Sequence, residues 1–164
     1  MAVADKGAAV VSLPSDTQIK IVRDFDAPAH LVFRTFTEPE LVKRWWHANR
    51  GGATIGDVDL RPGGTWRWVM VTHDGNEVAF HGEYGEIDPG RRLVYTEVYE
   101  VPGVGDTPAV LNTLTFEETD GRTRLTSMTD CPSEDVRNAI VESGMEGGMQ
   151  DAYDLLEEVA ISLR

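Results

Sequence analysis

The sequence contains little cysteine, few basic side chains and no long apolar run. Cys131 is the single cysteine among 164 residues, which excludes an intrachain disulfide and a four-cysteine zinc site. Lysine and arginine together number 15 against 28 aspartate and glutamate residues, so the formal net charge is −13. Nucleic-acid phosphates and anionic membrane surfaces both attract basic proteins. We therefore expect no nucleic-acid partner and no membrane association.

Long apolar segments are also missing. No stretch approaches the roughly 18 consecutive apolar residues that mark a membrane-spanning helix. The short apolar run in residues 8–13 lacks the basic leader of a signal peptide, and we expect residues 1–16 to form a flexible N-terminal tail. These features favour a cytoplasmic protein. Residues 17–164 are enough for one domain with its own core, and 41% of the chain is hydrophobic.

Motifs for metal, nucleotide or nucleophilic chemistry are absent. No two histidines have the helical spacing of a zinc site, and His81-Gly82-Glu83 lacks the Pro-Cys-x-x-Cys that completes a deaminase zinc motif. There is no G-x-S-x-G elbow, no dinucleotide fingerprint and no phosphate loop. Cys131 has no neighbouring histidine to activate it. We expect no metal and no cofactor, and a binding protein rather than an enzyme.

Alternating polar and apolar residues make up most of the chain. Residues 17–26 alternate as a strand does, and helix starts follow at Asp26-Ala27-Pro28 and at Thr37-Glu38-Pro39, which predicts two short helices. Alternation between turn sequences then predicts further strands over residues 54–60, 65–72, 78–87, 93–100, 110–117 and 122–129. Short turns between neighbouring strands favour an antiparallel sheet.

The last segment changes to a helical pattern. A helix begins near Ser133, and Gly144, Gly147 and Gly148 predict a break before a long apolar stripe over residues 145–163. The acidic residues of this helix fall mostly off the stripe, and we expect a solvated face, with a docking face for a basic partner as the alternative. These acidic residues are Asp151, Asp154, Glu157 and Glu158. The element order predicts an α+β fold in which a curved antiparallel sheet wraps around the long C-terminal helix.

Five segments carry a resemblance to a known superfamily. They are DAPAHLVFRTFTEPELVKRWW (26–46), VDLRPGGTWRWVM (58–70), GEYGEIDPGRRLVYTE (82–97), LTFEETDGRTRLT (114–126) and GMEGGMQDAYDLLEEV (144–159). In this order and spacing, the chain resembles the Hsp90 ATPase activator-like branch of the START/birch-pollen-allergen-like (SRPBCC) superfamily. The resemblance implies the helix-grip fold, with a cavity between the sheet and the last helix. That superfamily includes ligand carriers, aromatases, cyclases and chaperone-associated domains.

Two departures from the relatives bear on function. Many relatives have a tryptophan where this chain has Met145, and Met149 lies one turn further, so the resemblance implies a softer cavity wall here. The eukaryotic activator resembles this chain in one domain only and has an additional N-terminal domain. A chaperone partner is therefore not expected.

The candidate ligand contacts are the large side chains that we assign to the inward faces. An ordinary hydrophobic core is as good a reading of these aromatic residues as a cavity lining, and the resemblance is the main support for the cavity. Glu97 and Asn112 add polar groups on the same faces, and a salt bridge with an arginine is the alternative for Glu97. The predicted site comprises Phe33, Phe36, Trp45, Trp46, Trp66, Trp68, Met70, Phe80, Tyr95, Glu97, Tyr99, Asn112, Met145, Met149 and Tyr153.

Three functions fit this pattern. The first hypothesis is non-catalytic binding of a small hydrophobic or aromatic molecule in the cavity. The second is a polyketide cyclase or aromatase in which Glu97 or His47 moves protons. The third is a chaperone-associated or other protein-interaction module. The sequence leaves open whether two chains form a homodimer.

Overall fold

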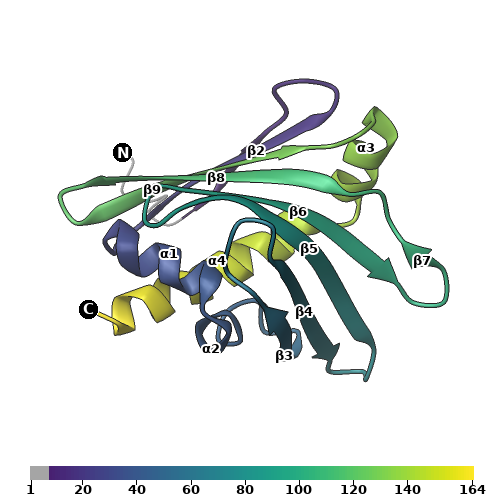
Figure 1. Ribbon diagram of the computed structural model, residues 1–164, viewed down its shortest axis with the longest axis horizontal. Helices are drawn as coiled ribbons and strands as arrows, with labels where there is room; N and C mark the ends of the chain where they lie inside the picture. Colours follow the sequence, from purple (N-terminus) through teal and green to yellow (C-terminus); the bar gives the residue numbers. More distant parts are fainter. Residues whose placement is uncertain (1–7) are drawn as a thin grey trace.

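One antiparallel sheet forms the framework of the protein. The computed structural model describes residues 8–164, apart from the side chains of residues 55 and 56 (Figure 1). The strands follow the order β1-β2-β9-β8-β6-β5-β4-β3, and β7 pairs with β6 off this path. Their bounds are β1 Val10–Ser12, β2 Gln18–Phe25, β3 Gly51–Val58, β4 Thr65–Thr72, β5 Glu77–Asp88, β6 Arg92–Val101, β7 Gly105–Asp106, β8 Val110–Thr119 and β9 Arg122–Asp130.

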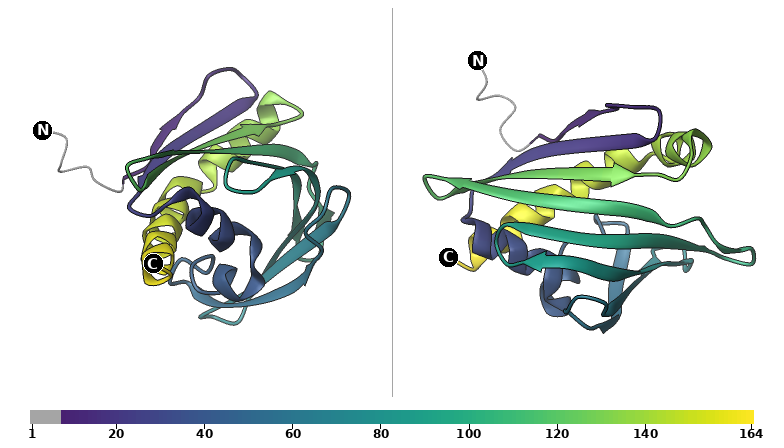
Figure 2. Two further views of the ribbon diagram at one scale, coloured as in Figure 1. Left: turned by 60° about the vertical axis from the view of Figure 1, so that its left-hand side comes forward. Right: turned by 45° about the horizontal axis from the view of Figure 1, so that its top comes forward.

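Within residues 8–164, four helices complete the fold. They are α1 Ala29–Thr37, α2 Pro39–Val42, α3 Glu134–Glu142 and α4 Met145–Ser162. The sheet curves around α1 and α4, so that both helices lie on its concave side (Figure 2). This arrangement confirms the predicted helix-grip fold, including the two short helices after the first long strand.

Local sequence accounts for the break between the last two helices. Ser133 caps α3, since its Oγ accepts a hydrogen bond from the Val136 N–H at 3.2 Å. Gly144 has a φ of +84°, a left-handed conformation that glycine adopts without steric cost. The chain therefore turns at Gly144 and starts α4 in a new direction, as the sequence predicted.

The start of α1 uses a partner that the sequence did not indicate. The sequence predicts a helix start at Asp26-Ala27-Pro28, and the N-cap residue is Pro28, which makes no side-chain hydrogen bond. The Ala29 N–H instead donates to Glu118 Oε1 at 2.8 Å. A carboxylate from β8 thus satisfies a free donor and complements the positive end of the helix.

The N-terminal segment contains structure where we expected a flexible tail. Val10–Ser12 forms β1 and pairs with β2, so the expectation is wrong for these residues. Gln150 on α4 fixes the preceding residue, because it accepts from the Ala9 N–H at 3.0 Å and donates to the Ala9 carbonyl at 2.8 Å. Two backbone groups therefore find partners only in the folded protein. The part of the expected tail in residues 1–7 lies outside the described residues.

A buried arginine joins β2 to α4. The Arg23 guanidinium donates to Asp154 at 2.8 Å and to Glu157 at 3.1 Å, and it lies 5.1 Å from the Phe25 ring centroid. The Arg23 side chain is 1% exposed and that of Glu157 only 16%. We expected the acidic face of the last helix to be solvated. That expectation is wrong at Glu157, whose carboxylate neutralises the buried Arg23.

The core is closed at one end of the sheet and open at the other. Phe25, Leu93, Leu114 and Leu156 are at most 1% exposed and form the closed end with α1. Further along the same inner faces, toward α3, the side chains of β6 and of the first turns of α4 become half-buried. This decrease in burial along the inner face marks the location of the candidate site.

Candidate functional site

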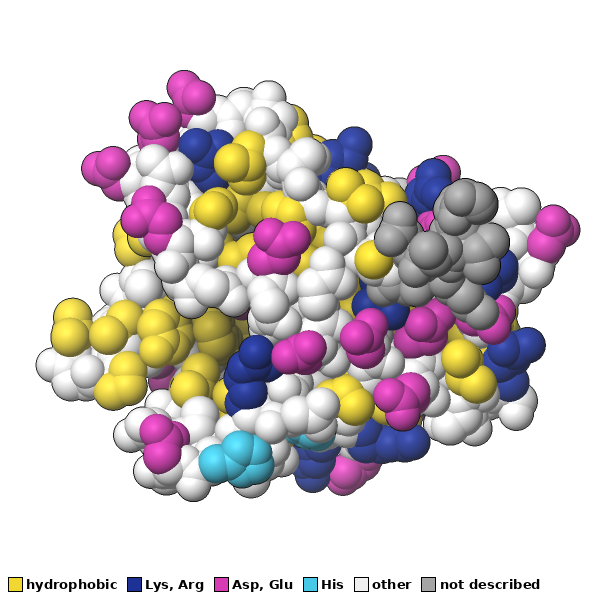
Figure 3. Space-filling model, turned by 180° about the vertical axis from the view of Figure 1, so that it is seen from behind, with side chains coloured by type: hydrophobic (Ala, Val, Ile, Leu, Met, Phe, Trp, Pro, Cys, Tyr) yellow, Lys and Arg dark blue, Asp and Glu magenta, His cyan; other side chains and the backbone are white. Residues whose placement is uncertain are grey.

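The inner face of the sheet opens toward α3. On β6 the buried Leu93 is followed on the same face by Tyr95, Glu97 and Tyr99, all of them half-buried. On α4, Leu156 is fully buried whereas Met149 and Met145 are half-buried. Figure 3 shows hydrophobic side chains gathered in a hollow at this end of the molecule. We call this region, bordered by Phe80, Tyr95, Glu97, Tyr99, Met145 and Met149, the open end.

Aromatic rings line the sheet side of the open end. Phe80 and Tyr99 stack, with ring centroids 4.9 Å apart and an interplanar angle of 29°. Trp46 lies edge-on to Phe80 at 5.8 Å and to Trp68 at 5.6 Å. These separations are typical of favourable aromatic pairs, and they join rings from β4, β5, β6 and the turn after α2 into one wall.

A second set of rings links this wall to the closed core. Trp66 contacts Trp68 at 5.1 Å and Tyr95 at 5.7 Å. Trp45 lies 6.1 Å from Trp68 and 6.3 Å from Tyr153 on α4. All four tryptophans of the chain therefore belong to one network.

Two tryptophan N–H groups in this network are enclosed without an acceptor. Trp66 Nε1 and Trp68 Nε1 are buried and have no hydrogen-bond partner among the described residues, whereas Trp45 Nε1 donates to the Thr35 carbonyl at 2.7 Å. Trp66 lies over Gly82, where an added Cβ would be 2.7 Å from its Nε1 and 1.8 Å from the Thr96 carbonyl oxygen. Gly82 is thus required by the close packing of β5, β6 and this indole.

Three polar side chains beside the aromatic wall, Glu97, Asn112 and Thr129, are connected by hydrogen bonds, and we call them the polar group. Asn112 Nδ2 donates to Glu97 Oε1 at 2.6 Å, and Thr129 Oγ1 donates to Asn112 Oδ1 at 2.6 Å. They come from β6, β8 and β9, which are neighbours in the sheet. Burial raises the pKa of Glu97, although the hydrogen bond from Asn112 acts in the opposite direction. Burial therefore favours the protonated form of this carboxyl group.

Two tyrosines beside Glu97 keep their protons. Burial, and secondarily the Glu97 charge, raise the pKa values of Tyr95 and Tyr153 above the usual range. Their hydroxyl groups therefore stay neutral at physiological pH and can donate hydrogen bonds. The arrangement offers a carboxyl group and phenolic donors on an otherwise apolar surface, which is the composition of a small-molecule site.

The structure distributes the predicted site residues over both ends of the core. Trp46, Trp68, Phe80, Tyr95, Glu97, Tyr99, Met145 and Met149 are half-buried toward the open end, and Trp45, Trp66, Asn112 and Tyr153 are buried behind them. Phe33 and Phe36 lie at the closed end against Phe116, with centroids at 5.6 and 6.0 Å. Met70 is half-buried on the inner face of β4, pairing in register with Val78. The rings of Phe33 and Phe36 are both buried, Phe36 also lies 5.2 Å from Trp45, and their part in ligand binding stays a prediction.

His47 takes part in the turn that follows α2. Its Nδ1 accepts a hydrogen bond from the Asn49 N–H at 3.0 Å. Neither its bonds nor the contacts of Glu97 join the two side chains. His47 and Glu97, the two alternative candidates for moving protons in an enzyme, are therefore not in contact with each other among the described residues.

Thr129 belongs to the polar group but was not predicted from the sequence. It pairs in register with Asn112 across β8 and β9. Asn112 was recognised from its alternation with inward apolar residues, and the same alternation places Thr129 in line with Leu125 and Ser127. A correct register for the two strands would have identified it.

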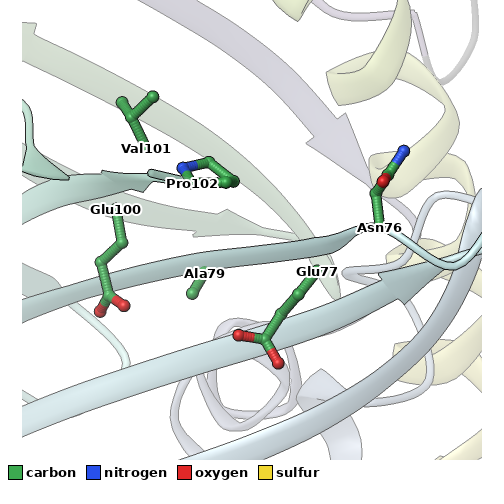
Figure 4. A pocket seen from close by; sticks show the side chains of 6 residues that line it. All are labelled: Asn76, Glu77, Ala79, Glu100, Val101 and Pro102. Carbon is green, nitrogen blue, oxygen red and sulfur yellow. The ribbon is translucent and has the colours of Figure 1, made fainter. Parts of the chain in front are cut away.

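A separate pocket lies on the outer face of the sheet, where β5 and β6 pair. Its volume is about 330 Å³, and its lining residues are Asn76, Glu77, Ala79, Glu100, Val101 and Pro102 (Figure 4). Glu100 is already bound by Arg67 at 2.8 Å and by His81 at 2.7 Å. These contacts, with Arg67 first, lower the pKa of Glu100 to about 2. One of the two carboxylates that line this pocket, that of Glu100, is therefore committed to structural ion pairs.

Clusters of metal ligands and membrane-spanning helices are both absent from the described residues. Within residues 8–164, no group of three or more histidine, cysteine, aspartate or glutamate side chains is placed to hold a metal ion. None of the helices in this part of the chain is long and apolar enough to cross a membrane.

Comparisons with solved structures identify the fold. Protein Ms6760 from Mycobacterium smegmatis superposes with a TM-score of 0.83 at 23% identity, covering 95% of this chain and 99% of that one. A protein from Rhodobacter sphaeroides gives 0.84 at 25% identity, covering 94% and 99%. Protein NE0264 from Nitrosomonas europaea gives 0.76 at 26% identity, covering 92% and 98%. No match was found among the curated proteins.

A family model supplies the relationship. The model described as "Activator of Hsp90 ATPase homolog 1-like protein" matches residues 26–160, which include both the aromatic wall and the polar group. Together, the fold and the family support a ligand-binding domain in general terms. The chain belongs to the activator of Hsp90 ATPase homolog 1-like family, within the SRPBCC superfamily.

Proposed function

We propose that the protein binds a small hydrophobic or aromatic molecule at the open end, between the sheet and the start of α4, without catalysing a reaction. The observation that carries the proposal is the burial gradient along the inner face. Large side chains that would normally complete a core, including Phe80, Tyr99 and Met149, stay half-buried together toward α3. Apolar surface left accessible in this way is a favourable place for an apolar ligand.

The polar group gives such a ligand an orientation. Asn112 is held from both sides, by Glu97 and Thr129, and so its amide has a fixed direction. The ligand's apolar body would lie against the aromatic wall, and its polar atom would meet Glu97. Apolar walls with a few fixed polar groups are the usual design of small-molecule sites.

Filling the open end tests this proposal. We expect wild-type protein to bind the neutral apolar dye N-phenyl-1-naphthylamine, and we expect Met149→Trp to weaken that binding at least tenfold. The larger side chain would occupy the space that the dye needs. Dye fluorescence at increasing protein concentration measures the affinity, and circular dichroism checks that the variant is folded.

A matched control separates filling from a general effect of tryptophan. Leu111 lies on β8 and is 41% exposed, so Leu111→Trp adds the same side chain away from the open end and should leave dye binding unchanged. If the wild-type protein binds neither this dye nor any member of an apolar compound set in thermal-shift assays, the proposal is wrong. Equal dye binding by wild type and Met149→Trp would also reject this location.

A further inference from the structure

Arg23 and Glu97 are two ionisable side chains of the interior, and they differ in the charge of their partners. Arg23 is neutralised by two carboxylates at 2.8 and 3.1 Å. Within the described residues, Glu97 has no lysine, arginine or histidine in ion-pair contact, and its partner is the neutral amide of Asn112. An unpaired carboxylate removed from water is costly, and a cation beside it would offset that cost.

The hydrogen bonds leave one carboxylate oxygen of Glu97 for a ligand. Oε1 accepts from Asn112, and the Asn112 oxygen is in turn occupied by Thr129. No described residue donates to Glu97 Oε2. The side chain is half-buried at the open end, so a bound molecule can approach this oxygen. A charged donor on a ligand would form a short, charge-assisted bond there.

Aromatic residues lie on both sides of this carboxylate along the strand. Tyr95 and Tyr99 flank Glu97 on the same face of β6, because alternate residues of a strand share one side. Phe80 stacks on Tyr99 at 4.9 Å, and Trp66 lies edge-on to Tyr95 at 5.7 Å. The negative faces of such rings attract cations, most strongly where water is excluded.

The mouth of the open end carries the same sign of charge. Acidic side chains gather beside the hollow where α3 lies (Figure 3). Residues 134–146 contain Glu134, Asp135, Glu142 and Glu146 against one basic residue, Arg137. A surface of this kind raises the local concentration of cations.

We propose that the open end selects an organic cation, that is, an ammonium group on a hydrophobic body, which pairs with Glu97 between the rings of Tyr95 and Tyr99. This inference rests on the proposed function, since it specifies the class of ligand for the same site. It assigns Glu97 a recognition role and explains why a carboxylate is retained among aromatic side chains.

Three compounds of nearly equal size and different charge test the inference: 4-phenylbutylamine, 4-phenylbutan-1-ol and 5-phenylpentanoate. We expect the amine to bind wild-type protein at least tenfold more tightly than the alcohol, and the carboxylate to bind most weakly. Calorimetric titration, supported by quenching of the tryptophan network, measures the three affinities. In Glu97→Gln the amine and the alcohol should bind within twofold of each other, with the affinity of the alcohol unchanged.

Two further variants identify the source of any preference for the amine. Tyr99→Leu should reduce amine affinity severalfold more than alcohol affinity, because it removes one ring face. Glu134→Gln together with Asp135→Asn should leave the equilibrium preference within twofold of wild type at 0.15 M salt, where exposed charges are screened. These variants keep the test valid if Glu97→Gln does not fold.

The possible contrary results separate three statements: that the site selects cations, that Glu97 is responsible, and that the open end binds ligands at all. Equal or tighter binding of the alcohol or the carboxylate by wild type would refute cation selection while preserving the apolar site. A preference for the amine that persists in Glu97→Gln and disappears in the α3 double variant would assign it to surface charge and reject the role of Glu97. Failure of all three compounds and of the apolar dye would reject the site itself, and the inference with it.

Discussion

At the scale of single residues, Glu97 should reduce stability at neutral pH. Burial raises its folded-state pKa above the unfolded value, so its contribution to stability is fully present below the unfolded pKa, near 4.5, and is lost as the pH rises through the folded pKa. Glu97→Gln removes this loss. We expect the variant to melt roughly 2–4 °C higher than wild type at pH 8, the shift that about 1 kcal/mol produces in a domain of this size.

The same variant should have almost no effect at pH 4, where wild-type Glu97 is protonated and resembles glutamine. Differential scanning calorimetry at the two pH values measures both differences. A variant that is less stable than wild type at pH 8 would contradict the burial argument, since it would mean that the charged form is favoured by the fold.

Residue positions were predictable where strand alternation alone decides them. Alternation placed Glu97 and Asn112 on the inner face beside apolar neighbours, and their bond at 2.6 Å joins them there. Thr129 was missed because its role depends on the register between β8 and β9, which alternation within one strand does not specify. Phe33 and Phe36 were correctly assigned to an inward face, but that assignment does not specify which end of the core a side chain fills. The structure places both against Phe116.

At the scale of elements, the ion pairs of Arg23 attach α4 to β2. Glu157→Leu should lower the free energy of unfolding by about 3 kcal/mol, because it leaves a buried guanidinium with one partner fewer and removes the acceptor of the Asp26 N–H at 2.8 Å. Asp154→Asn should cost less than about 1 kcal/mol, because the Asp154 side chain is 64% exposed. Urea unfolding at pH 7 measures both values.

A double replacement separates charge from packing in this attachment. Arg23→Met combined with Glu157→Met removes both buried charges, and we expect it to be more stable than Glu157→Leu alone. Equal costs for Glu157→Leu and Asp154→Asn would instead show that the buried pair contributes no more than an exposed one.

Elements with strong local signals were predictable, and those that depend on tertiary partners were not. Turn sequences such as Asp74-Gly75 and Asp120-Gly121 separate strands that the structure contains close to the predicted bounds. β1 has three residues, too few for a pattern, and its neighbour Ala9 is held by Gln150 from the other end of the chain. The buried role of Glu157 was hidden for the same reason, although Arg23 lies in line with the inward Ile19, Ile21 and Phe25.

At the scale of the whole molecule, the packing gradient from the closed end to the open end should appear as a gradient of mutational cost. Leu156 is 0% exposed, and Leu156→Ala should cost about 3 kcal/mol, because the cavity it leaves cannot be filled by solvent or by collapse. Met149 lies two turns earlier on α4 and is half-buried, so Met149→Ala should cost about 1 kcal/mol or less. Chemical unfolding gives both values, and dye titration should show that Met149→Ala still binds whereas Met149→Trp does not. Similar costs at the two positions would mean that the inner face is packed uniformly, and a uniformly packed interior would leave no space for the ligand that the open end is proposed to hold.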